Sequence, residues 1–175
     1  MKPINLIALL CIGSILFSCK KEISNTSATE TSAIIPGQNK TATGISVPFK
    51  GTYNTTRELL SPPPVVQVKI IGMGAATHLG KSKFIISSTI NFTTPPPFPL
   101  HGTSIFYAAD GDTFYTTFTG SSTPLADGTF LAIFNHTITG GTGRFENAGG
   151  SFVGHHIGHP VNPEGHTVVE GFIDY

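Results

Sequence analysis

The sequence is poor in cysteine, tryptophan and charge. Its 175 residues include two cysteines, no tryptophan and only 11% charged residues, and the formal net charge is zero. No basic run is present, and this argues against binding of nucleic acid. Because the cysteines stand at positions 11 and 19, a domain formed by the rest of the chain contains no disulfide. Such a domain must be stable through its apolar core alone.

Sustained helical periodicity is also missing. Beyond the first 18 residues, apolar side chains do not recur at the 3.6-residue interval of an amphipathic helix. The chain instead has 20 glycines, 13 prolines and 13 phenylalanines, together with many threonines and serines. Most of these residues are poor helix formers, and phenylalanine and threonine are enriched in strands. The composition therefore predicts an all-β protein.

The N-terminal segment has the pattern of a signal peptide. Lys2 precedes a mostly apolar stretch from Ile4 to Phe17. This stretch is too short for a membrane-spanning helix, which needs roughly 20 apolar residues. It ends in Ser18 and Cys19, and the sequence LFSC at positions 16–19 resembles the lipobox of bacterial lipoproteins.

That resemblance implies cleavage before Cys19 and lipidation of its thiol and new amine, with palmitate-type acyl chains. Several acyl chains anchor a protein stably, because each buried CH₂ contributes about 0.8 kcal/mol. Lys20 rather than aspartate follows the cysteine, and by resemblance to lipoprotein sorting this favours the outer membrane. We expect a cell-envelope protein whose partner is the membrane, while the leaflet and the oligomeric state stay open. An ordinary secretory signal with an incidental cysteine is the alternative.

The rest of the chain divides into a linker and one domain. Residues 20–44 are rich in Ser, Thr, Asn and Gly and bury too little apolar surface to fold, so they are typical of a flexible spacer. From Ile45 onward, eight short runs with alternating or β-rich character are separated by Gly, Pro, Asp or Asn. We expect a signal peptide over 1–18, the lipidated cysteine and linker over 19–44, and the domain over 45–175.

Eight short antiparallel runs indicate a sandwich or a closed barrel, and closure removes exposed strand edges. An eight-stranded barrel is either filled by its own side chains or holds one small ligand. A transmembrane barrel is the competing architecture, but the outward positions of the run 83–92 are Lys, Ser, Thr and Asn. On the same run, the residues expected to face inward are Phe84, Ile86, Ser88, Ile90 and Phe92.

A glycine motif links the domain to a known fold. The segment Ile138–Phe152, ITGGTGRFENAGGSF, resembles the GGTGxFxxAxG motif of dirigent proteins and the related motif of allene oxide cyclases. The resemblance implies an eight-stranded antiparallel barrel with a central cavity, and it carries the fold but no matched catalytic residues. From the residues themselves, the glycines favour a turn or bend and Phe145 is expected to plug the barrel. The motif residues are Gly140, Gly141, Gly143, Phe145 and Gly149.

Histidine is the residue type most able to carry chemistry here. His78 is followed by Gly80 at a strand end, which makes it a weak candidate site residue at a barrel mouth. His155 and His156 point to opposite faces of a strand, and His155 and His159 lie about 13 Å apart along it. We therefore interpret this cluster as exposed histidines at a polar strand end and expect no metal site and no cofactor. His136 lies in an apolar run and is expected to be a hydrogen-bonded core histidine.

Three functions remain open from the sequence. The first is a non-catalytic binding or scaffold module for a small hydrophobic ligand, which the lack of an assignable acid–base pair or nucleophile favours. The second is a cyclase-like or dirigent-like enzyme that shapes a reactive hydrophobic substrate, with catalytic residues unknown. The third is a structural envelope protein with a filled barrel. The volume of any cavity separates the third hypothesis from the other two.

Overall fold

The computed structural model describes residues 44–175. The expected signal peptide, Cys19 and the linker as far as residue 43 lie outside the described residues. No helix within 44–175 is long and apolar enough to cross a membrane. The described elements are β1 (Ser46–Leu59), β2 (Val65–Ala76), β3 (Gly80–Asn91), β4 (Phe98–Tyr107), β5 (Thr113–Pro124), β6 (Phe130–Gly141), a 3₁₀ helix η1 (Gly143–Phe145), β7 (Gly149–Gly158) and β8 (Glu164–Asp174).

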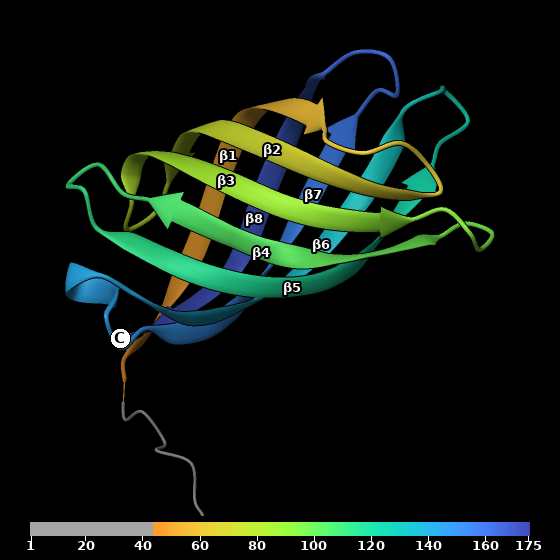
Figure 1. The fold of residues 1–175 in the computed structure, drawn as a ribbon. Helices are drawn as coiled ribbons and strands as arrows, with labels where there is room; N and C mark the ends of the chain where they lie inside the picture. The colour runs from red at the N-terminus through yellow and green to blue at the C-terminus, as the bar shows by residue number, and fades with distance from the viewer. Residues whose placement is uncertain (1–43) are drawn as a thin grey trace, which may run out of the picture. The chain divides into compact units, whose positions relative to one another are not determined.

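The eight strands close into one antiparallel barrel, which confirms the fold class predicted from the sequence. Each strand pairs with the next in the chain, and β1 also pairs with β8 from Ser46 opposite Asp174 to Thr56 opposite Glu164. Figure 1 shows the strands wrapping around one interior, with β1 and β8 side by side. The closed sheet leaves no unpaired strand edge.

The connecting loops divide between two ends of the barrel. The loops β1–β2, β3–β4, β5–β6 and β7–β8 lie at one end, which we call the open end (Figure 1). The loops β2–β3 and β4–β5, the η1 segment and the C-terminus lie at the other, which we call the closed end. Because all strands run the length of the barrel, each has one half near each end.

Alternation along each strand sets the interior. On β3, Phe84, Ile86 and Ser88 are buried while Ser87 between them is exposed, as the period of two predicts. The expectation for the end of this run was wrong in one respect. Phe92 follows the last residue of β3 and is 40% exposed, because the chain has left the sheet there and the alternation no longer applies.

Aromatic rings fill the closed half of the barrel. Phe106 lies at their centre, with its ring stacked on Phe114 at a centroid distance of 4.7 Å and within 5.4 Å of Phe84 and Phe152. All of these rings are almost wholly buried and most pairs meet edge to face, which is a favourable aromatic geometry. The fully buried rings of the cluster are Phe49, Tyr53, Phe84, Phe106, Phe114 and Phe145.

The glycine motif forms the β6–β7 connection at the closed end. Gly140 and Gly143 have φ angles of 120° and 53°, which lie in the positive range that favours glycine. The φ angles of Gly141 and Gly149 lie outside that range. At Gly143, a Cβ would overlap the carboxylate of Asp112, which accepts a hydrogen bond from the Arg144 backbone N–H. The turn places Phe145 from η1 inside the barrel with no exposed surface and its ring 5.4 Å from that of Phe114.

Candidate functional site

A largely apolar cavity of about 320 Å³ lies at the open end of the barrel. Inward residues of the strand ends form its walls, and residues of all four open-end loops or their flanks border it. Its volume falls at the lower end of the range of small-molecule sites, which runs from roughly 300 to 1,000 Å³. The side chains of its wall include Arg57, Val66, Val68, Ile70, Ile90, Ala132, Phe134 and His156.

The cavity follows from the sizes of the inward side chains. In the closed half the inward positions carry Phe or Tyr on β1, β3, β4, β5 and β7. In the open half several of them carry smaller side chains, as at Val68, Ser88 and Ala132, beside larger ones such as Phe134 and His156. An eight-stranded barrel is just wide enough for large side chains to meet across it. Smaller ones leave the space open, so this barrel is filled only in part.

Exposed apolar side chains lie at the open end of the barrel, and Leu59, Phe92 and Leu125 among them also line the cavity. They come from every open-end loop or its flanking strand. Clusters of exposed apolar side chains are uncommon on protein surfaces and often mark binding sites. Phe92 also packs against Phe98 of the same loop, with ring centroids 4.7 Å apart. We call these residues the apolar rim: Leu59, Leu60, Val65, Phe92, Leu125 and Val161.

His156 projects into the barrel and lines the cavity. Its side chain is 2% exposed, and its Nδ1 lies 2.9 Å from the Thr167 hydroxyl. A Cβ on Gly158 would come within 2.9 Å of its Nε2, and one on Gly165 within 2.7 Å of its Cε1. The ring therefore occupies space that these two glycines leave free.

The sequence-based interpretation of the 155–159 histidines was wrong for His156. His155 is exposed on the outer face, but its neighbour is buried because Phe152, Gly154 and His156 share the inward face of β7. The period of two counted from Phe152 could have found it. Burial lowers the pKa of His156 to about 4, with a smaller contribution from the positive charge of Arg57. The imidazole is therefore neutral at pH 7.

Arg57 brings the one formal charge to the described lining of the cavity. Its Nη2 donates hydrogen bonds to the carbonyls of His159 (3.0 Å) and Pro160 (2.8 Å), which ties β1 to the β7–β8 loop. Its guanidinium lies 5.3 Å from the centroid of the Phe130 ring, within the range of a cation–π contact. Partial burial lowers the pKa of Arg57 from its usual value, although an arginine remains protonated at neutral pH.

A second buried histidine belongs to the core, as expected. The Nδ1 of His136 lies 2.9 Å from the Thr116 hydroxyl, and Ser104 hydrogen bonds to that same hydroxyl. The imidazole stacks on Phe152 at 4.4 Å, and burial lowers its pKa to about 3. This group is enclosed by aromatic rings and has no place among the cavity-lining residues.

His78 lies at the closed end, away from the cavity. It stands in the β2–β3 turn with φ of 64°, is exposed, and its Nε2 lies 3.2 Å from the Pro48 carbonyl. Its own carbonyl accepts a hydrogen bond from Arg144, which also pairs with Asp110 at 3.1 Å. These contacts hold neighbouring loops together over Phe145, and none of them brings His78 near an apolar cavity.

No group of three or more potential metal ligands is brought together within residues 44–175. One buried polar atom of that range, the Thr55 hydroxyl, has no hydrogen-bond partner there. Thr55 shares the inward face of β1 with Tyr53 and Arg57. A polar atom left unpaired inside a barrel costs free energy.

Comparisons of the chain with protein-family models, with curated proteins and with solved structures give no match. The fold thus stands on the strand topology, and the likeness to cyclases and dirigent proteins stays a prediction from the glycine motif.

Proposed function

We propose that this protein is a lipid-anchored cell-envelope protein whose barrel binds one small hydrophobic molecule without transforming it. The observation that carries this proposal is the cavity of about 320 Å³ at the open end. A purely structural barrel has no need of such a space, since filling it with larger side chains would add packing energy.

The lining supports a hydrophobic ligand. Aliphatic and aromatic side chains dominate it, and its polar groups are few and dispersed. That is the usual composition of small-molecule sites, in which an apolar wall supplies affinity and a few polar groups fix orientation. The apolar rim extends the same character to the loops of the open end.

The ionisable groups at the cavity favour binding over catalysis. The described lining contains no carboxylate and no cysteine. His156, with a pKa of about 4, is a weak base at neutral pH, and its Nδ1 is already engaged with Thr167. General acid–base catalysis works best when the pKa lies near the working pH.

The cavity can be filled by mutation to test the proposal. Ala132 is buried on β6 and lines the cavity, so Ala132→Phe places a ring in the space that a ligand would take. We expect the affinity of the full-length chain for the neutral dye Nile red to fall about tenfold or more, because a filled site has lost its binding surface. Fluorescence titration measures this.

A matched control lies one residue away on the same strand. Ile133 points to the outer face of β6 and does not line the cavity, so Ile133→Phe should leave dye affinity unchanged. Equal affinity of wild type and Ala132→Phe would contradict the proposal, and so would equal losses in both variants.

The lipid anchor rests on the LFSC sequence at positions 16–19. We expect cells grown with an alkyne fatty acid to incorporate the label into the wild-type protein and not into Cys19→Ala, because acylation needs that thiol. Cys11→Ala is the control, since it removes the only other cysteine and should leave labelling intact. Labelling that survives Cys19→Ala would disprove the anchor.

A further inference from the structure

The cavity has an uncompensated charge at its wall. Arg57 lines it, yet no carboxylate of the described residues lies within ion-pair distance of the guanidinium. The carboxylates nearest in sequence and register, Glu58 and Glu164, are exposed on the outer face. A partly buried charge without a partner is costly and is rarely left so without a reason.

The guanidinium also keeps donors free. Of its five N–H bonds, the two on Nη2 are directed at the carbonyls of His159 and Pro160. Those on Nε and Nη1 have no acceptor among the described residues. The two loop carbonyls and the contact with Phe130 hold the group in place. It is therefore preorganised, and binding an anion there costs little side-chain entropy.

Two other polar side chains of the lining, His156 and Ser88, do not compete for this role. His156 is neutral at pH 7 because burial disfavours its charged form. Ser88 is directed at the backbone carbonyl of His101. A ligand anion thus meets one positive charge at the wall, with aliphatic side chains such as Val66, Val68 and Ile90 close by in the lining.

We propose that the ligand is an amphiphilic carboxylate, with its apolar body in the cavity and its carboxylate on the free N–H groups of Arg57. This inference rests on the proposed binding function and names the class of its ligand. A carboxylate matches one guanidinium in charge and geometry. A phosphate monoester carries more charge at neutral pH than the single cation of this lining can balance.

Decanoate, 1-decanol and decyl phosphate share one chain length and differ in the head group. Their affinities for the full-length chain can be measured at neutral pH by displacement of Nile red, at concentrations where each probe stays monomeric. We expect Arg57→Gln to weaken decanoate about ten- to a hundredfold, as for loss of a charged hydrogen-bonded contact. The affinity of 1-decanol should change less than about threefold.

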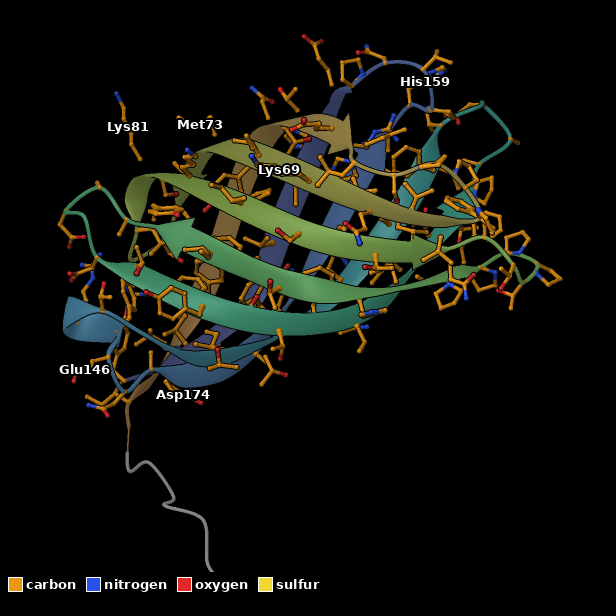
Figure 2. The ribbon with its side chains drawn as sticks, in the orientation of Figure 1. Lys69, Met73, Lys81, Glu146, His159 and Asp174 are labelled. Atoms are coloured by element: carbon orange, nitrogen blue, oxygen red, sulfur yellow. The ribbon has the colours of Figure 1, made fainter. Side chains whose placement is uncertain are left out.

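Two further variants separate charge from structure. Arg57→Lys keeps the cation and should retain most of the decanoate affinity, although it loses the planar fork. Lys81→Gln removes a positive charge from an exposed side chain that points away from the barrel at the closed end (Figure 2). Lys81→Gln should change the affinity for neither decanoate nor 1-decanol. This result would exclude a general effect of net charge.

Each outcome decides between the two proposals. If Nile red binds but decanoate and 1-decanol lose affinity equally in Arg57→Gln, the carboxylate inference fails and the binding function stands. Tighter binding of decyl phosphate than of decanoate to wild type also overturns the carboxylate head group. If wild type binds neither Nile red nor any of the three probes, the binding function itself is wrong. Failure of Arg57→Lys to restore decanoate affinity contradicts the role of the charge.

Discussion

Replacing Phe106 by alanine should lower the free energy of unfolding by about 3–5 kcal/mol, the range for deleting a buried aromatic side chain. Phe106 has no exposed surface, and its ring meets those of Phe49, Tyr53, Phe84, Phe114 and Phe152. These neighbours come from several strands, so they cannot all move inward to close the hole. Since small domains are stable by roughly 5–15 kcal/mol, the loss is a large part of the total.

Urea unfolding followed by circular dichroism measures this difference. Phe172→Ala is the control, because the same side chain on β8 is 55% exposed on the outer face and its loss should cost less than about 1 kcal/mol. Equal costs for the two variants would show that the aromatic cluster does not hold the closed half of the barrel.

The free energy of unfolding should decrease as the pH is lowered from about 6.5 to about 4.5, a range that lies mostly above the usual pKa values of carboxylates. Burial lowers the pKa of His136 to about 3 and that of His156 to about 4, whereas an unfolded histidine titrates near 6.5. Below about pH 6.5 the histidines of the unfolded chain become protonated, whereas the two buried histidines of the folded chain stay neutral. The free energy of unfolding therefore decreases as the pH is lowered. At about pH 4.5 the loss is roughly 2–3 kcal/mol for each histidine.

The free energy of unfolding measured between pH 7 and about pH 4.5 tests this window. His156→Gln keeps a side chain able to hydrogen bond with Thr167 and should remove roughly half of the slope. His155→Gln changes the exposed neighbour on the outer face and should leave the slope unchanged. A stability that stays flat down to about pH 4.5 would mean that neither imidazole is buried in its neutral form.

The fold could be predicted from the sequence because a closed sheet imposes one simple rule. Eight runs with a period of two, each ended by turn residues, leave few arrangements that hide every strand edge. The alternation over Phe84, Ile86 and Ser88 matches the observed burial. The expectation of an inward side chain failed at Phe92, where the run leaves the sheet.

The candidate site could be predicted only in outline. The sequence left two outcomes open, a barrel filled by its own side chains and a barrel with a ligand-sized cavity. The volume of the cavity depends on which inward side chains meet across the barrel, and this in turn depends on the register of the strands. Arg57 was missed although it continues the inward series Phe49, Tyr53 and Thr55 on β1. His156 was misplaced although it continues the series from Phe152 on β7. In both cases the period of two continues along the whole strand and places the side chain inside the barrel.

We propose that the open half of the barrel holds one small hydrophobic molecule. Native mass spectrometry of the protein purified from its own cells measures this directly. We expect a single small adduct on the wild-type protein that is lost on unfolding and is absent from Ala132→Phe. A bare wild-type mass, together with no thermal shift on adding Nile red or decanoate, would contradict it.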